Sequence, residues 1–251
     1  MPYRIDISSP AREGFDRLVD LGALDIEAHD GGVAAIIPDH VTPAEIADAL
    51  HVHDVTVSPA AARDNGSVWL LAPRAVHAGP HVVQLIDSTA FGTGHHPTTA
   101  LCIESIEQIL TSGIPSRLLD VGTGSGVLAI AGLKMGISRA LGIDIDAEAL
   151  KIAAQNAHLN SVADRFEVAM GGPDAVADVW PLVVANILAG PLIEMAPILV
   201  RRVASHGRLI LSGIPASLES EILRVYCNLG MRRVESRIRS GWAVLVVTPS
   251  W

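Results

Sequence analysis

The chain has 251 residues, of which 49% are apolar and only 4% are aromatic. This length suits one large domain or a main domain with a smaller partner, and a core of Ala, Val, Leu and Ile is typical of a buried parallel sheet. The net charge of −9 argues against a nucleic-acid partner, because basic residues hold such partners through their phosphates.

Residues 1–60 have the pattern of a small α+β domain. Thr42 is a good N-cap with Glu45 completing a capping box, and Pro43 suits the first position of a helix that ends near residue 50. An earlier helix ends at Gly22. The run 30–32, Asp-Gly-Gly, marks a hairpin turn. Alternating apolar residues predict strands at 3–8, 25–29, 33–39 and 53–59. The order strand–helix–strand–strand–helix–strand is that of a ferredoxin-like domain.

Residues 61–86 are expected to form a connector, with strands at 67–73 and 81–87. Strands and helices then alternate strictly through residues 87–251, with strands expected at 117–121, 140–145, 165–170, 182–186 and 207–212. This alternation predicts a parallel sheet with helices on both faces. The last two segments, 231–240 and 241–250, have only a turn between them, so they must pair antiparallel.

A glycine-rich turn lies between the strand LLDV and the next helix. Gly122, Gly124 and Gly126 follow one another as G-x-G-x-G, which lets the backbone turn sharply and approach a ligand closely. A dinucleotide site would place its third glycine at position 127, where this chain has Val, and a nucleotide-triphosphate loop would need a Lys-Ser or Lys-Thr pair after the glycines.

Two acidic residues narrow the identity of that ligand. Asp144 ends the next strand, where a carboxylate can accept hydrogen bonds from both ribose hydroxyls, and Asp120 precedes the glycines. Negative charge at Asp120 repels a pyrophosphate but suits a cationic amino-acid tail. S-adenosylmethionine, an adenosine with such a tail and a positive sulfur, fits these features, and an ordinary glycine-rich turn with surface acids is the alternative.

The sequence is identified here as resembling the class I methyltransferases. The stretches LLDVGTGSGVLAIAGLKMG and ALGIDID carry that resemblance, and AFGTGHHPTTALCIE together with VVANILAGPL makes it specific. These segments are similar to the PrmA-like family of ribosomal protein L11 methyltransferases. The resemblance implies a Rossmann-like sheet of seven strands, the last one antiparallel, and a catalytic domain at 87–251. It also implies that domain 1–60 recognises a protein substrate, ribosomal protein L11.

The resemblance implies a cofactor site for S-adenosyl-L-methionine. In the family the FGTGHHPTT loop closes on the cofactor, and Thr99 matches a cofactor-contacting threonine. The expected cofactor-binding residues are Phe91, Thr98, Thr99, Asp120, Gly122, Thr123, Gly124, Gly126, Asp144, Ile145, Asn186 and Ile187. No metal is expected, because no further ligands accompany His95 and His96 at a suitable spacing. These histidines either shape the loop or contact substrate.

Asn186 is the expected catalytic residue. It ends the fourth strand of the catalytic domain, at the edge of the sheet where α/β sites lie. Its side chain can accept a hydrogen bond from an attacking amine and aim the nitrogen at the methyl group, although it could instead cap the next turn. The expected activity is therefore protein N-methylation of lysine or α-amino groups. The alternatives are an N-methyltransferase of another protein or a small amine, and a non-catalytic cofactor-binding module.

Two remaining features bear on the compartment. Cys102 and Cys227 both lie in apolar helical patterns, so we expect two buried thiols and no disulfide. The apolar stretch 181–200 contains three prolines, an Asn and a Glu, and it is interpreted as strand, turn and helix, with a membrane span as the alternative. Without a signal-peptide pattern at residue 1, the sequence predicts a cytoplasmic protein that contacts neither membrane nor nucleic acid.

Overall fold

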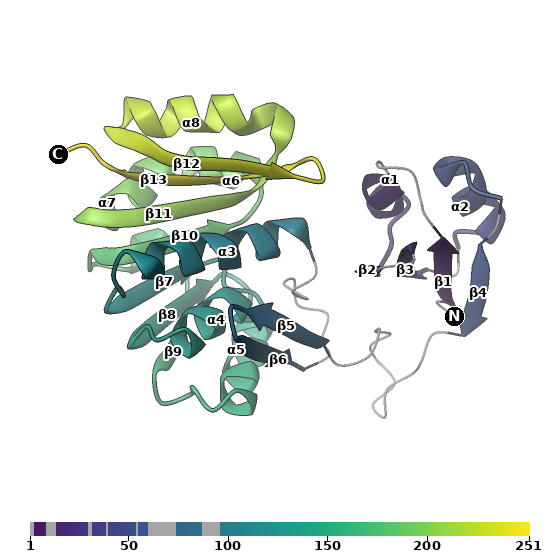
Figure 1. Cartoon of the computed structure of the whole chain (residues 1–251), viewed down its shortest axis with the longest axis horizontal. Coiled ribbons are helices and arrows are strands. Elements are labelled where there is room, and N and C mark those ends of the chain that lie inside the picture. Colours follow the sequence, from purple (N-terminus) through teal and green to yellow (C-terminus); the bar gives the residue numbers. More distant parts are fainter. Residues whose placement is uncertain are drawn as a thin grey trace. The chain divides into compact units, whose positions relative to one another are not determined.

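The structure is a computed structural model that describes residues 3–8, 14–29, 32–38, 40–53, 55–59, 74–86 and 96–251. The chain divides into two compact units, Met1–Pro73 with Asp87–Thr89, and Arg74–Ile86 with Ala90–Trp251. Figure 1 colours them along the sequence. The expected strand at 67–73 lies outside the described residues.

The first unit is a four-stranded antiparallel sheet with two helices. The elements follow in the order that the sequence predicts: β1 (Tyr3–Ser8), α1 (Gly14–Asp20), β2 (Asp25–His29), β3 (Gly32–Ile37), α2 (Pro43–Leu50) and β4 (Thr56–Pro59). The strand order across the sheet is β2-β3-β1-β4. Ile5, Ile7 and Ile37 on one face pack against Leu18 of α1 and Ile46 of α2. Both halves of the predicted capping box at the start of α2 are present.

The second unit is built on a seven-stranded sheet in the order β12-β13-β11-β10-β7-β8-β9. The five strands from β11 to β9 are parallel, and β13 runs antiparallel to both of its neighbours, as expected for the last strand. Their bounds are β7 (Arg117–Val121), β8 (Arg139–Asp144), β9 (Phe166–Met170), β10 (Trp180–Asn186), β11 (Val203–Pro215), β12 (Met231–Arg239) and β13 (Trp242–Pro249).

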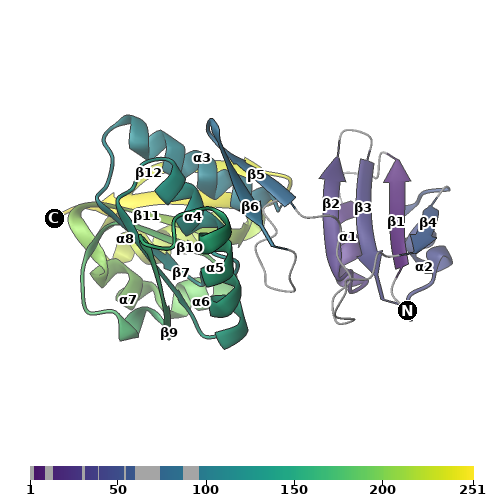
Figure 2. The same ribbon diagram turned by 90° about the horizontal axis from the view of Figure 1, so that it is seen from below.

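Helices cover both faces of this sheet (Figure 2). Successive strand residues point to opposite faces, so Leu118 packs beneath α3 (Pro97–Thr111), α4 (Val127–Lys134) and α5 (Ala147–Leu159). Leu119 packs on the other side, beneath α6 (Ala189–Glu194), α7 (Ala196–Arg201) and α8 (Glu219–Asn228). Short 3-10 turns lie at Pro173–Ala175 and Ala216–Leu218. The two cores use mainly aliphatic residues, which agrees with the low aromatic content.

A hairpin of β5 (Arg74–Ala78) and β6 (His81–Leu85) belongs to the second unit. Val76, Val83 and Leu85 of the hairpin are buried in the same core as α3, α4 and α5. Residues 74–86, which the sequence assigns to the connector, are therefore packed on the second unit. The expected strand at 81–87 corresponds to β6.

One expectation about the cysteines is wrong. Cys102 is buried on α3 as predicted, but Cys227 on α8 is exposed, and both are free thiols. The buried side of α8 carries Ile222 and Tyr226, and Cys227 is turned about 100° away from Tyr226 on the helix. The apolar stretch 181–200 forms β10, α6 and α7, and none of the described helices is both long and apolar enough to span a membrane.

Candidate functional site

Three neighbouring strands bring the predicted site residues to one edge of the sheet. β10, β7 and β8 lie side by side and run parallel, so their carboxyl ends meet there. β7 leads into the glycine loop, β8 ends at Asp144, and β10 ends at Asn186. Sites of α/β proteins lie outside this edge, so the arrangement is that of a ligand site.

The glycine loop, residues 122–126, needs its glycines. Gly122, Gly124 and Gly126 have φ angles of 70°, 53° and 79°, a left-handed conformation that other residues rarely adopt. The N–H groups of Gly122 and Thr123 both donate to the carbonyl of Ile143 in β8, at 2.9 and 3.0 Å. The loop is thereby joined to the neighbouring strand, and it presents the start of α4, where helical N–H groups lack intrahelical partners, to a ligand.

Asp120 lies beneath the loop and is 1% exposed. Its Oδ2 atom accepts hydrogen bonds from the Thr123 hydroxyl at 2.8 Å and from the Ala129 N–H at 3.3 Å. Burial raises the pKa of this carboxyl from 3.8 to about 7, assisted by the charge of Asp144 and opposed by the two hydrogen bonds. Asp120 therefore holds the loop and places a titratable acid at the site.

Asp144 has both carboxylate oxygens engaged by backbone. Oδ2 accepts from the Gly124 N–H at 2.9 Å, and Oδ1 accepts from the Asp146 N–H at 3.1 Å. Each carboxylate oxygen keeps further acceptor capacity for a ligand hydroxyl. The following residue, Ile145, is 83% exposed, so an apolar side chain flanks the carboxylate at the surface.

The segment after β10 packs closely on the glycine loop. A Cβ at Gly122 would lie 2.4 Å from Cγ2 of Ile187, and one at Gly213 would lie 2.1 Å from the Ile187 carbonyl oxygen. Glycine at both positions therefore lets residue 187 settle beside the loop. Asn186 is 9% exposed, and its Oδ1 atom has no hydrogen-bond partner among the described residues.

The first turn of α3 contributes two buried threonines. His96 caps this helix, with its Nδ1 accepting from the Thr98 N–H at 3.3 Å and lying 2.7 Å from the Thr98 hydroxyl. Burial lowers the pKa of His96 to about 4, and its ring packs edge-on against Trp242 of β13 at 4.9 Å. Thr99 is 0% exposed, and its hydroxyl lacks a partner within the described part of the chain.

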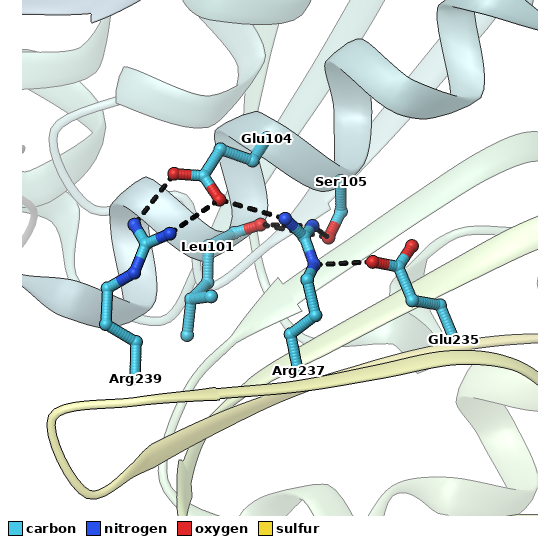
Figure 3. A network of polar contacts seen from close by, with 6 residues as sticks. All are labelled: Leu101, Glu104, Ser105, Glu235, Arg237 and Arg239. Atoms are coloured by element: carbon cyan, nitrogen blue, oxygen red, sulfur yellow. Dashed lines mark hydrogen bonds and ion pairs between the residues drawn. The ribbon is translucent and has the colours of Figure 1, made fainter.

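Ion pairs from β12 hold α3 on the sheet (Figure 3). Arg237 pairs with Glu104 at 2.9 Å and donates to the Ser105 hydroxyl at 2.7 Å. Arg239 donates two hydrogen bonds to the carboxylate of the same Glu104, at 2.7 and 3.0 Å. Arg237 also contacts Glu235 and the carbonyl oxygen of Leu101. The helix that carries Thr98 and Thr99 is therefore fixed along its middle by two arginines of one strand.

Most of the predicted site residues lie at one edge of the sheet or on α3, and the others lie outside the described residues. Asp120, the glycine loop with Thr123, Asp144 and Ile145, and Asn186 and Ile187 lie at the same sheet edge, while Thr98 and Thr99 lie on α3. Phe91 and His95 lie outside the described residues, as does most of the FGTGHHPTT loop. Among the described residues no cluster of three or more His, Cys, Asp or Glu side chains could hold a metal ion.

Sequence reasoning missed Arg237, Trp242 and Asn156, a buried residue of α5 that contacts the glycine loop. Arg237 and Glu104 are separated by 133 residues in the chain. A single sequence carries no local signal for such a pair, and an Asn in a helix reads as an ordinary polar residue.

Comparison with known proteins gives one family. The model of the family described as ribosomal protein L11 methyltransferase (PrmA) matches residues 69–249. The ribosomal protein L11 methyltransferase of Chromohalobacter salexigens is 47% identical over 177 residues, and that of Geobacter sulfurreducens 41% over 174. Each match covers 69% of this chain and 56% of the relative, so the chain spans about half the length of these relatives.

Solved structures show the same fold. The crystal structure of a ribosomal protein L11 methylase from Lactobacillus delbrueckii subsp. bulgaricus has a TM-score of 0.58 and 32% identity, and the match covers 64% of this chain and 82% of that one. A magnesium protoporphyrin IX methyltransferase from Synechocystis has a TM-score of 0.52 at 16% identity, covering 60% of this chain and 82% of that one, and it shares the fold alone.

Proposed function

Because the chain belongs to the ribosomal protein L11 methyltransferase (PrmA) family, we propose that it transfers methyl groups from S-adenosylmethionine to amino groups of ribosomal protein L11. The observation that carries the proposal is the sheet edge where the glycine loop, Asp144 and Asn186 meet. The substrate amines would be lysine or α-amino groups, and the reaction would take place in the cytoplasm, where ribosomal proteins are made.

The residues at this edge fit the cofactor. Thr99 and Asn186 each keep a buried oxygen that has no partner among the described residues, and leaving such an atom unpaired costs about 1–3 kcal/mol. A bound ligand would relieve that cost. Asp144 would accept the ribose hydroxyls, Ile145 and Ile187 would flank the adenine, and the start of α4 would face the cofactor carboxylate. Asp120 would balance the cofactor's positive charge from beneath the loop.

Methyl transfer depends on aligning the amine nitrogen with the methyl group more than on an acid or base residue. The cofactor supplies a methyl group on a positive sulfur, which is a good leaving group. Asn186 would accept a hydrogen bond from the substrate amine through Oδ1 and so aim the nitrogen lone pair at the methyl carbon. S-adenosylmethionine, held by Asp144 and the glycine loop, would supply the methyl group to that nitrogen and leave as the neutral thioether. A lysine amine has a pKa of about 10.4 in water, and burial beside Ile187 and Leu188 would lower it.

Calorimetry with S-adenosylhomocysteine tests the cofactor assignment. Asp144→Ala should weaken binding by roughly ten- to a hundredfold, because charge-assisted hydrogen bonds contribute about 1.5–3 kcal/mol each. Asp146→Ala is the matched control, since the Asp146 side chain caps α5 through the Glu148 N–H, and the substitution keeps the backbone N–H that donates to Asp144. Equal affinity of the two variants, or tight binding of NAD, would contradict the assignment.

The substrate is tested by incubating the protein with labelled S-adenosylmethionine and a cell extract, and by identifying the labelled species. Label on lysine or α-amino groups of ribosomal protein L11 is expected. Label on another protein or on a small amine would keep the cofactor chemistry and replace the substrate.

A further inference from the structure

Asn156 of α5 joins the glycine loop to the end of β6. Its side chain is 0% exposed. Nδ2 donates to the carbonyl oxygen of Ser125 in the glycine loop at 2.8 Å, and Oδ1 accepts from the N–H of Ile86 at 2.7 Å. Both polar atoms of the amide are therefore used, each by the backbone of a different segment.

The bond to Ile86 fixes which way the amide faces. Because the Ile86 N–H can only be met by the oxygen, the nitrogen must point to the other side, where the Ser125 carbonyl lies. The amide of Asn or Gln carries a donor and an acceptor on one planar group at every pH, whereas an Asp ionised at neutral pH can only accept, and Asn has a shorter reach than Gln. The residue type is thus the one that the two backbone partners require.

Asn160, the residue that follows α5 directly, provides an internal comparison. Its amide accepts from the Gln84 N–H at 2.8 Å and donates to the Gln84 carbonyl oxygen at 2.6 Å. Lys134 of α4 donates to the Val82 carbonyl oxygen at 2.6 Å and to Asn160 at 3.0 Å. Asn160 therefore binds the backbone of β6 through both atoms of its amide, and neither of these two bonds is to the glycine loop.

We propose that Asn156 is a positioning residue of the cofactor site, which holds the Ser125 carbonyl and so sets the shape of the glycine loop before cofactor binds. The inference rests on the proposed function. Three glycines in a left-handed conformation leave the loop with many alternative states, and each state that persists weakens binding. Asp120 and Asp144 hold the loop from the sheet and would themselves face the cofactor, whereas Asn156 holds it from α5.

The test compares Asn156→Asp with Asn160→Asp by calorimetry with S-adenosylhomocysteine. An ionised Asp at position 156 can still accept from Ile86 but presents an oxygen to the Ser125 carbonyl, so the loop loses its hydrogen bond to α5. At pH 8 we expect Asn156→Asp to weaken binding at least tenfold relative to the unmodified protein, and Asn160→Asp less than threefold. Thermal unfolding of both variants reports any general loss of stability.

Acid rescue separates positioning from a general structural role. A protonated Asp carries an O–H that can donate to Ser125 while the other oxygen accepts from Ile86, as Asn does, and burial favours this neutral form. Lys134 donates to Asn160 and not to Asn156, so it is an ionic partner for an Asp at position 160. The affinity ratio between Asn156→Asp and the unmodified protein should therefore approach one at pH 5. A ratio that does not change with pH would overturn the inference.

A measurement on the unmodified protein covers the case in which Asn156→Asp does not fold. S-adenosylhomocysteine should slow hydrogen exchange in a peptide spanning Val82–Ile86, because a stiffer glycine loop steadies Asn156 and its bond to Ile86. Unchanged exchange there would overturn the inference. Equal affinity of Asn156→Asp and the unmodified protein at pH 8 would also overturn it while leaving the proposed function intact. Failure of the unmodified protein to bind would overturn the proposed function itself.

Discussion

Asp120 carries an ionisable group into the core at the point where β7 ends. Its pKa in the folded chain is about 7, against 3.8 for the unperturbed group. Between about pH 4 and pH 7 the folded chain therefore binds more protons at this residue than the unfolded chain, and its contribution to stability falls as the pH rises. Above pH 7 the ionised carboxylate is a cost, which the positive charge of the cofactor would offset.

Asp120→Asn should consequently stabilise the ligand-free protein at pH 8. The shift of about three pKa units sets an upper limit of the order of 4 kcal/mol, and the gain should vanish near pH 4. Affinity for S-adenosylmethionine at pH 8 should fall, because the negative charge is gone. Thermal unfolding from pH 4 to pH 8 and calorimetry measure the two effects. A variant less stable than the unmodified protein at pH 8 would contradict the burial argument.

Thr98 and Thr99 offer a neighbouring pair with opposite expectations. Both are 0% exposed, but the Thr98 hydroxyl lies 2.7 Å from His96 Nδ1, whereas the Thr99 hydroxyl has no partner among the described residues. Val has the same shape as Thr and lacks the hydroxyl. Thr99→Val should raise the free energy of unfolding by about 1 kcal/mol and weaken S-adenosylhomocysteine binding, while Thr98→Val should lower stability by a similar amount. The same sign in both variants would refute this assignment.

At the scale of elements, the sequence predicts those helices and strands whose signals lie in neighbouring residues. β1 and β7 lie at the residues that the sequence predicts, 3–8 and 117–121. The predicted capping box of α2 also forms, between Thr42 and Glu45. β5 was missed, because only its packing on α3 and its pairing with β6 make a strand of RAVHA. β11 runs from Val203 to Pro215, well beyond the predicted 207–212, since pairing with β10 and β13 extends it at both ends.

The residues of the candidate site likewise divide into those that the sequence predicts and those that it does not. The glycine loop and Asp144 could be predicted, because their spacing follows from the chemistry of one ligand. The residues that fix them could not be, since Asn156 reaches Ile86 across 70 positions and Arg237 reaches Glu104 across 133. Which side of α8 is buried depends on how the helix packs on the sheet, and for this reason the prediction that Cys227 is buried is wrong.

The arginines of β12 give a prediction for α3. Glu104→Gln removes the charge that Arg237 and Arg239 share, and the three side chains are 36%, 29% and 47% exposed. Solvent screening reduces such pairs, so the expected loss is about 1–2 kcal/mol, or a fall of roughly 2–8 °C in the unfolding midpoint. Binding of S-adenosylhomocysteine should weaken with it, because α3 carries Thr99. Glu107→Gln, on the exposed side of α3, is the control and should change neither quantity.

At the scale of the whole molecule, the two units have separate cores. Every described residue assigned to the cofactor site belongs to the second unit, and the family match begins at residue 69. The first unit, with its own sheet and capped helix, remains the proposed substrate-recognition part, as the sequence predicts for residues 1–60.

A fragment that begins at Ser67 should therefore fold and bind S-adenosylhomocysteine as tightly as the full chain. It should lose methyl transfer to ribosomal protein L11, because the docking surface that would align the amine is missing. Circular dichroism, calorimetry and labelled methyl transfer measure the three properties. Transfer to L11 at the rate of the full chain would show that residues 1–66 do not select the substrate.

The polar side chains that bind the backbone along β6 also bear on aggregation in concentrated solution. A two-stranded hairpin leaves a free edge that can recruit strands from other chains and begin aggregation. In this protein Lys134, Asn160 and Asn156 occupy the backbone groups of Val82, Gln84 and Ile86 along that edge. The backbone groups on this edge are thus already bonded within the molecule and less open to a strand from another chain, and three polar side chains do here what a further strand does elsewhere in a sheet.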